Sequence, residues 1–311
     1  MSFFLGIDTS NYTTSVALYN STENTVKSVK KLLEVNLGEV GLRQSDALFQ
    51  HIKQVHLLID ELLNDFDGKI TAVGVSSKPR NQEGSYMPCF LAGVSVANSI
   101  ASALRIPCYN FSHQSGHIAA ALFSCGRLDL IDKKILAFHI SGGTTEALLV
   151  EKNEDNIINC EIVGKSLDLK MGQAIDRAGV MLCLPFPAGK YLDELSLKGT
   201  SPIKFKPCIK GTDCCISGIE NKCLELKNKN ESKENIARFV IDSCCKTVDK
   251  MTENLLEKYG DLPLLFAGGV MSNTIIKEFI IKKYGALFAQ PQFSSDNACG
   301  TAVLASIKHK I

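Results

Sequence analysis

The sequence predicts a two-domain α/β fold made of two related halves. Its 311 residues exceed one ordinary hydrophobic core, so we expect two domains of about 150 residues each. Hydrophobic residues make up 45% of the chain, which is enough to fill both cores. A succession of strands, hydroxyl-rich turns and helices runs through the first half and begins again near residue 134. We therefore expect a boundary near 128–133, with one half over 1–130 and the other over 131–311.

A short internal match supports the idea of a duplication. Placing residues 5–19 (LGIDTSNYTTSVALY) on residues 136–150 (LAFHISGGTTEALLV) aligns five identical residues without a gap. Five matches in so short a window can arise by chance. Both segments, however, are typical of hairpins with small and hydroxyl residues at the bend, which makes duplication the more attractive interpretation.

The first half contains clear strand and helix patterns. Residues 45–66 carry apolar side chains at helical spacing, and Ser45 is the expected N-cap. The stretch ITAVGVSS is typical of a buried strand, and LAGVSVANSIASAL of a helix rich in small residues. We expect strands over 3–8, 15–20 and 70–77, helices over 45–66 and 91–104, and a short strand, IPCYNFS, that leads to a pair of histidines.

The second half shows the same kinds of pattern, with an inserted segment expected at about 165–233. Within it, residues 200–233 have no clear periodicity and are rich in lysine, so we expect an irregular, solvated surface rather than a nucleic-acid patch. Elsewhere we expect strands over 134–140, 146–152 and 262–267, a glycine turn over 268–273, and helices over 234–259, 274–284 and 296–309.

The overall charge excludes no particular partner but favours none. The net charge is +1, from 34 basic and 33 acidic residues, so nothing global indicates a nucleic acid or a membrane surface. We find neither an export signal nor an apolar run near 20 residues. The twelve cysteines form no C-x-x-C pair, so we expect a cytoplasmic protein with reduced, buried cysteines. The spacing of Cys208, Cys214 and Cys215 argues against a zinc site.

The stretch FSHQSGH places His113 and His117 four residues apart. On a helix these side chains share one face, so both imidazoles can reach one ion. A single pair of this kind usually means ordinary helix histidines. A metalloprotease would need glutamate after the first histidine, and Gln114 stands there instead. As a third ligand we expect Asp296, in SSDNACG, because two histidines and one carboxylate leave open positions on a metal.

Three glycine- or hydroxyl-rich turns suit phosphate oxygens, because they expose backbone N–H groups without side-chain bulk. DTSNYTT and SGGTT occur once in each half, and AGGVMSN follows a buried strand and opens a helix. Each turn alone is a weak signal. Together, at equivalent places, they predict a nucleotide bound in a cleft between the halves. The chain contains no P-loop sequence.

Taken in order, these motifs resemble those of the TsaD family, the catalytic subunits of tRNA threonylcarbamoyladenosine synthase, once called glycoproteases. LGIDTSNYTTSVALY resembles the family's L-G-I-E-T-S-C-D-E-T, HQSGH matches H-x-x-G-H, and SGG matches its S-G-G loop. GQAIDRAG resembles G-E-A-F-D-K, and PFPAGKYLD resembles Y-P-G-G-x-x-x-D. AGGVMSN matches G-G-V-x-x-N, and SSDNACGTAVLA resembles C-T-D-N-x-A-M-I-A. The likeness runs nearly end to end.

The resemblance implies a ribonuclease-H-like, actin-like fold of the sugar-kinase, heat-shock and actin superfamily. It implies that His113, His117 and Asp296 hold a metal through which they act in catalysis. Motif by motif, the residues implied to bind substrate or nucleotide are Asp8, Ser10, His139, Ile140, Ser141, Gly142, Gly143, Thr144, Asp176, Gly189, Asp193, Gly268, Gly269 and Asn273.

The implied activity is transfer of a threonylcarbamoyl group from its adenylate to adenosine next to the anticodon of tRNA. The implied cofactors are one divalent ion, iron or zinc, and an adenine nucleotide, either the adenylate or ATP. The implied partners are tRNA, an inactive paralogue, a small ATPase and an upstream enzyme that makes the adenylate. No membrane is implied.

Several positions depart from the family pattern. Thr144 replaces the histidine of S-G-G-H-T, and Glu220 stands where a lysine is expected. A longer, polar segment over 78–89 replaces a G-P-G loop. The chain therefore resembles a diverged paralogue, in which His139 is a candidate to replace the lost histidine. The alternatives are a nucleotide- and metal-binding paralogue without transferase activity, a metallopeptidase, and a small-molecule kinase.

Overall fold

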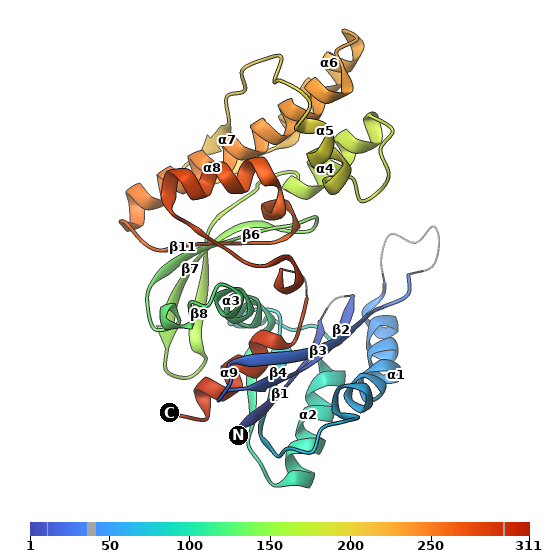
Figure 1. The fold of residues 1–311 in the computed structure, drawn as a ribbon, viewed down its shortest axis with the longest axis vertical. Helices are drawn as coiled ribbons and strands as arrows, with labels where there is room; N and C mark the ends of the chain where they lie inside the picture. The colour runs from blue at the N-terminus through green and yellow to red at the C-terminus, as the bar shows by residue number, and fades with distance from the viewer. Residues whose placement is uncertain (11, 36–41, 295) are drawn as a thin grey trace. The chain divides into compact units, whose positions relative to one another are not determined.

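The computed structural model describes residues 1–10, 12–35, 42–294 and 296–311 (Figure 1). Contacts divide the chain into two compact units, and its strands form two five-stranded sheets and a two-stranded one among the described residues. The first unit comprises Met1–Lys133, Glu151–Cys160 and Gln292–Ile311, and the second comprises Lys134–Val150 and Glu161–Pro291. The C-terminal segment thus belongs with the first sheet, although the expected boundary placed it in the second half. That boundary, at 130/131, stays a prediction.

The first sheet has the strand order β3-β2-β1-β4-β5, in which β1, β2 and β3 are antiparallel and β4 and β5 run parallel to β1. Its edge strand β3 was not predicted, because it is lysine-rich and mostly exposed and so lacks a buried apolar run. The bounds are β1 Phe3–Ser10, β2 Thr13–Asn20, β3 Thr25–Leu32, β4 Ile70–Lys78 and β5 Cys108–Ser112.

Two predicted helices, α1 (Gln44–Leu63) and α2 (Phe90–Leu104), cover one face of this sheet (Figure 1). Their apolar stripes join alternate strand residues in one core cluster, which includes Leu5, Leu18, Val55, Leu62, Val73 and Ala97. The expected cap at Ser45 is wrong. Helix α1 begins one residue earlier, at Gln44, and Arg43 occupies the N-cap position without a side-chain hydrogen bond.

The opposite face of the first sheet is covered by α3 (His113–Ser124) and α9 (Cys299–Lys308). Helix α9 approaches closely because the strands present glycine to it. A Cβ atom at Gly6 would lie 2.3 Å from the backbone oxygen of Ala298, and one at Gly74 would lie 2.4 Å from that of Thr301. Helix α9 begins at Cys299 rather than at the expected residue 296, so Asp296 lies in the loop before it.

The second sheet repeats the topology of the first. Its order, β12-β11-β6-β7-β8, again places an antiparallel hairpin on one side of a central strand and parallel strands on the other. The register repeats as well. Leu5 faces Leu18 across the first hairpin. Leu136 faces Leu149 across the second, at the positions aligned by the internal match. The bounds are β6 Ile135–Ile140, β7 Thr145–Asn153, β8 Ile157–Lys165, β11 Leu264–Ala267 and β12 Leu287–Phe288.

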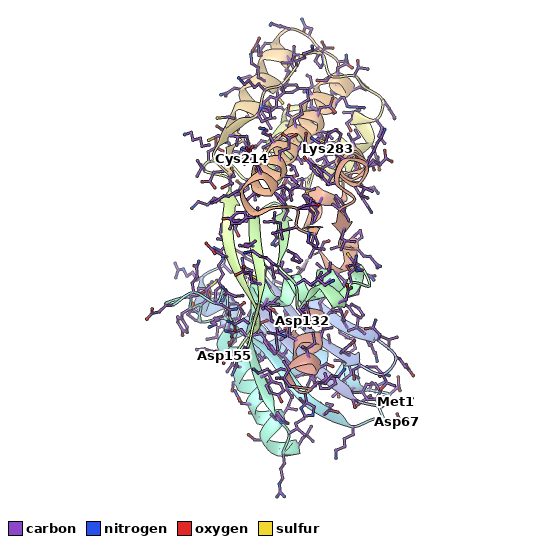
Figure 2. All side chains as sticks on the ribbon, turned by 90° about the vertical axis from the view of Figure 1, so that its left-hand side faces the viewer. Met1, Asp67, Asp132, Asp155, Cys214 and Lys283 are labelled. Carbon is purple, nitrogen blue, oxygen red and sulfur yellow. The ribbon has the colours of Figure 1, made fainter. Side chains whose placement is uncertain are left out.

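Helices of the second unit pack around the long helix α7, whose buried residues belong to an extensive core cluster. At its surface, Lys283 of α8, which is labelled in Figure 2, donates hydrogen bonds to Asp249 and Glu253 of α7, both at 2.7 Å. The bounds are α4 Met171–Met181, α5 Gly189–Ser196, α6 Ser217–Asn228, α7 Lys233–Tyr259 and α8 Thr274–Tyr284. Among the described residues, no helix is long and apolar enough to cross a membrane.

The prediction that residues 200–233 are irregular is wrong. The segment contains a hairpin of β9 (Cys208–Lys210) and β10 (Asp213–Cys215), followed by helix α6. Helix α6 buries Ile219, Cys223 and Leu226, a sparse stripe that the surrounding charged residues obscured. Short 3-10 turns complete the chain at η1 Leu128–Leu130, η2 Gly269–Ser272 and η3 Pro291–Phe293.

Candidate metal centre

The histidine pair lies at the start of α3, directly after strand β5. Ser112 caps the helix by accepting a hydrogen bond from the backbone N–H of Ser115 at 3.1 Å. The cap fixes the first turn, so that His113 and His117 lie one turn apart on the same face. Their ring centroids are 4.3 Å apart. The sequence prediction that both histidines belong to one helix is therefore confirmed.

Asp296 lies against both histidines. Its Oδ1 atom is 3.4 Å from Nε2 of His113 and 3.2 Å from Nε2 of His117. One ligand atom from each of the three residues lies within 4.8 Å of the others. All three side chains are partly accessible, at 11% for each histidine and 26% for the aspartate. The structure thus brings together the three residues that were predicted as metal ligands from the sequence, although Asp296 is far from the two histidines in the chain.

Close packing of α3 against α9 holds Asp296 in this position. A Cβ atom at Gly300 would lie 1.8 Å from the carbonyl oxygen of Gly116 and 2.7 Å from the backbone nitrogen of Ala120. The two helices therefore meet backbone to backbone, which is possible only where side chains are absent. The same packing explains why HQSGH contains a glycine. A Cβ atom at Gly116 would lie 3.3 Å from Oγ1 of Thr301 in α9.

Asp8 lies behind His113 and fixes its ring. The Oδ2 atom of Asp8 is 2.8 Å from Nδ1 of His113, and this carboxylate is 1% exposed. It also accepts hydrogen bonds from the backbone N–H of Ser10, at 2.9 Å, and from the hydroxyl of Ser76. A carboxylate only accepts hydrogen bonds, so Nδ1 of His113 carries a proton toward Asp8, and Nε2 is the ring nitrogen that faces Asp296 and could bind an ion.

The charges of the cluster favour ionised carboxylates. Burial acts to raise the pKa of Asp8, but the charge and hydrogen bond of His113 lower it below its usual value. Burial likewise opposes ionisation of Asp296, yet hydrogen bonds from both histidines hold its pKa well below the usual value. Burial acts to lower the pKa of His113, and the charge of Asp8 with the hydrogen bond of Asp296 raises it to about 10. Two ionised carboxylates around two imidazoles make a site complementary to a cation.

Of the remaining predicted binding residues, Ser10 also lies at this centre, with its Oγ atom 3.4 Å from Nε2 of His113. Most of the others belong to the second unit. There a pocket of about 800 Å³ is lined by six of them, namely Gly142, Asp176, Gly189, Asp193, Gly269 and Asn273. The other predicted residues of the second unit lie close in the chain to Gly142 or Gly269 but do not line the pocket themselves. They are His139, Ile140, Ser141, Gly143, Thr144 and Gly268.

The SGG segment forms a closed turn at the edge of this pocket. The backbone N–H of Ser141 donates to the carbonyl of Thr144 at 2.8 Å, and the N–H of Thr144 donates to the hydroxyl of Ser141 at 3.2 Å. A Cβ atom at Gly142 or Gly143 would meet no atom within 4 Å. There is therefore open space on the Cβ side of both glycines, whereas the backbone of Gly142 packs against Gly172, where an added Cβ atom would lie 2.7 Å from the Gly142 nitrogen.

The acidic residues of the pocket also hold its walls in place. Asp176 accepts a hydrogen bond from the backbone N–H of Ala188 at 2.9 Å. Asp193 accepts one from the side-chain amide of Asn273 at 2.7 Å and two more from Thr274. Asn273 in turn caps helix α8 by accepting from the N–H of Ile276. These contacts connect the PFPAGKYLD segment to the AGGVMSN turn across the pocket.

Sequence reasoning missed two features of these sites. Asp8 was expected near a nucleotide, and the structure shows it as the partner of His113, a contact 105 residues apart in the chain. Phe186 and Tyr191 line the pocket, and Phe186 is 76% exposed. Both aromatic residues lie in the PFPAGKYLD motif. The motif therefore pointed to them, but only its glycine and aspartate were predicted to bind substrate.

Comparison with known proteins decides the family. Residues 36–303 match the TsaD family model, described as tRNA N6-adenosine threonylcarbamoyltransferase. The chain belongs to the TsaD family. It is 29% identical to the tRNA N6-adenosine threonylcarbamoyltransferase of Carboxydothermus hydrogenoformans, over 94% of this chain and 88% of that protein. It is 27% identical to the protein of the same description from Halalkalibacterium halodurans, over 98% of this chain and 91% of the relative. This TsaD chain is therefore a transferase by family, as predicted.

Solved structures confirm the predicted fold class. The crystal structure of the ROK hexokinase from Thermus thermophilus superimposes with a TM-score of 0.55, covering 99% of both chains at 11% identity. At this identity the likeness concerns the fold alone. The TsaD chain thus has the duplicated α/β architecture of the sugar-kinase and actin-like proteins.

Proposed function

We propose that the protein transfers a threonylcarbamoyl group from threonylcarbamoyl-adenylate to the N6 amine of adenosine next to the anticodon of tRNA, with a metal held by His113, His117 and Asp296. Membership of the TsaD family supports the reaction class. The observation that carries the metal site is the convergence of three ligand atoms, from α3 and from the loop before α9, in front of the buried carboxylate of Asp8.

The donor set fits a divalent transition metal. Two imidazole nitrogens and one carboxylate oxygen suit zinc or iron and leave room for substrate in the coordination sphere. Ligand bonds of about 2.0–2.2 Å in tetrahedral geometry separate neighbouring ligand atoms by roughly 3.3–3.6 Å. The observed separations from Asp296 Oδ1 to the two Nε2 atoms are 3.4 and 3.2 Å. Asp8 supplies the outer-shell hydrogen bond that ligating histidines almost always have.

In this proposal each group of the chain has a defined task. A bound ion supplies Lewis-acid polarisation of the carbonyl that undergoes transfer, which the weakly nucleophilic aromatic amine requires. Asp8 keeps the proton on Nδ1 of His113 and so keeps Nε2 available. The backbone N–H groups of the glycine-rich SGG turn are suited to donate hydrogen bonds to phosphate oxygens of the adenylate. Exposed Phe186 offers an apolar surface for a purine ring.

The adenine nucleotide is the second half of the proposal. A pocket of about 800 Å³ has the size and mixed apolar and polar lining of a small-molecule site. Asp176, Asp193 and Asn273 are already held by hydrogen bonds to the pocket walls. Their positions are therefore defined before a ligand arrives, which favours orientation of the substrate.

The departures from the family pattern are compatible with this reaction. Thr144 closes the SGG turn through its own backbone N–H and carbonyl groups, which do not require a histidine side chain. Glu220 forms a 2.8 Å ion pair with Arg177 of α4. This pair is substantially exposed and so contributes little to stability. The partner subunits expected from the resemblance, the inactive paralogue, the small ATPase and the adenylate-forming enzyme, together with a cytoplasmic location, belong to the proposal.

The deciding experiment is transfer of a labelled threonylcarbamoyl group from its adenylate to unmodified tRNA, with the family partner subunits present. We expect labelled tRNA with the wild-type chain and none above background with His113→Ala. A TsaD relative run in parallel shows that the assay works. If that relative transfers the label and the present chain does not, the proposed function is wrong.

Replacing Asp8 with asparagine tests how His113 is held. The asparagine side chain keeps the shape of aspartate but cannot act as an ionised acceptor, so we expect the affinity for zinc to fall about 10- to 100-fold. The affinity is measured by competition with a chromophoric chelator in the metal-free protein, without reference to activity. Asp67→Asn, an exposed aspartate of the same unit (Figure 2), is the matched control and should bind zinc as the wild type does. Unchanged affinity in Asp8→Asn would remove Asp8 from the metal centre.

A further inference from the structure

Two cysteines face each other across the β9–β10 hairpin. In its antiparallel register, Lys210 pairs with Asp213, Ile209 with Cys214, and Cys208 with Cys215. Residues directly opposite in an antiparallel pair have Cα atoms about 4.5–5.5 Å apart. Disulfides need Cα atoms about 4.4–6.8 Å apart. The backbone of the hairpin therefore already satisfies the main geometric requirement for a Cys208–Cys215 bond.

Both thiols lie on the outer face of the hairpin. Because directly opposite residues project to the same side of a sheet, Cys208 and Cys215 share one face, and Cys214 projects to the other. Cys214, which is labelled in Figure 2, is completely buried in the core of the second unit. Cys208 is exposed and Cys215 is half-buried. This arrangement also explains why the three cysteines do not converge on one metal.

The surroundings give small anionic molecules access to the pair. Cys208 and Cys215 line a pocket of about 430 Å³ together with Lys204, Lys206 and Lys222. Lysine side chains attract the carboxylates of low-molecular-weight disulfides such as glutathione disulfide. The expectation that the cysteines of this chain are buried is wrong at this site and also at Cys183, which is exposed.

We propose that Cys208 and Cys215 are a reversible redox modification site, at which exchange with a low-molecular-weight disulfide joins the two thiols across the hairpin. This inference is independent of the proposed transferase function, because the hairpin belongs to the second unit and contains none of the metal ligands. The bond would connect β9 to β10 covalently at one wall of the lysine-lined pocket.

The exchange proceeds in two balanced steps. Cys208 reacts first, because it is the more exposed thiol and because burial raises the pKa of Cys215. Its thiolate attacks one sulfur of glutathione disulfide, the S–S bond breaks, and one glutathione leaves and takes up the proton. The thiolate of Cys215 then attacks the Cys208 sulfur of the mixed disulfide and releases the second glutathione. Two cysteine thiols are oxidised, and one glutathione disulfide is reduced to two thiols.

Lys210 makes the modification easy to detect. Trypsin cuts after this lysine and so places Cys208 in the peptide of residues 205–210 and Cys215 in the peptide of residues 211–222. The full-length protein is incubated with glutathione disulfide, its free thiols are blocked, and it is digested and analysed by mass spectrometry. We expect the two peptides to be recovered joined, and to separate on reduction with dithiothreitol.

Variants identify the bond. In Cys215→Ser we expect the joined species to fall at least about tenfold, with glutathione retained on Cys208, because the resolving thiol is absent. In Cys183→Ser, the matched control at another exposed cysteine, we expect the same amount as in the wild type. Fragmentation of the wild-type joined species assigns the bond to Cys215 rather than Cys214, whether or not every variant folds.

Three results would overturn the proposal. The first is wild-type protein that carries glutathione on Cys208 while the two peptides remain separate. The second is a joined species of equal abundance in Cys215→Ser, which would place the bond on Cys214. The third is a joined species that dithiothreitol does not separate.

Discussion

Replacing His113, His117 or Asp296 with alanine is expected to lower threonylcarbamoyl transfer by roughly a thousandfold or more. Lewis-acid polarisation contributes several kcal/mol to the transition state, and each 1.4 kcal/mol corresponds to a factor of about ten in rate. Each substitution removes one of three convergent ligand atoms. The initial rate of transfer and the metal content of the purified protein, by elemental analysis, are the two measurements.

The matched control is His56→Ala, which removes an exposed imidazole of α1 in the same unit. It should keep the wild-type rate and metal content. A chelator should reproduce the loss of activity in the wild type, and added zinc or iron should restore it. If His113→Ala kept both its metal and its rate, the three residues would not form the catalytic metal site.

Replacing Gly300 with alanine is expected to lower the free energy of unfolding by about 3 kcal/mol or more, at the upper end of overpacking costs. The new methyl group would lie 1.8 Å from the carbonyl oxygen of Gly116 and 2.7 Å from the backbone nitrogen of Ala120. These neighbours are backbone atoms of α3, which cannot rotate away as a flexible side chain can. The shift of α9 that must follow would also displace Asp296 from the histidines. Urea unfolding of the metal-free protein measures the stability.

Gly218→Ala is the control that separates the clash at Gly300 from the general effect of replacing a helical glycine with alanine. A Cβ atom at Gly218, in helix α6, would meet nothing within 4 Å. We expect this variant to be more stable than the wild type by about 0.5–1 kcal/mol, because alanine restricts the unfolded chain and favours helix. A Gly300→Ala variant as stable as the wild type would show that α3 and α9 are not packed backbone to backbone.

Local patterns in the sequence were sufficient for much of the fold. Apolar alternation and helical periodicity act over a few residues, so they locate strands such as β1 and β4 and helices such as α1 and α7. The internal match predicted the two equivalent hairpins, and the shared register of β1–β2 and β6–β7 agrees with it. Edge strand β3 and helix α6 were missed, because each buries too little apolar surface to stand out from its charged neighbours.

The order of the motifs by itself determined the family, the fold class and the three candidate ligands of the metal centre. Only the tertiary structure decided how these residues act together. The contact of Asp8 with His113 spans 105 positions, and that of Asp296 with His117 spans 179. Cys208 and Cys215 lie opposite each other because of the register of the β9–β10 hairpin, which no periodicity in the sequence predicted. Such contacts depend on how helices and strands pack against one another, as where Gly300 allows α9 to touch α3. Sequence patterns that extend over a few residues do not determine which of these elements will be in contact.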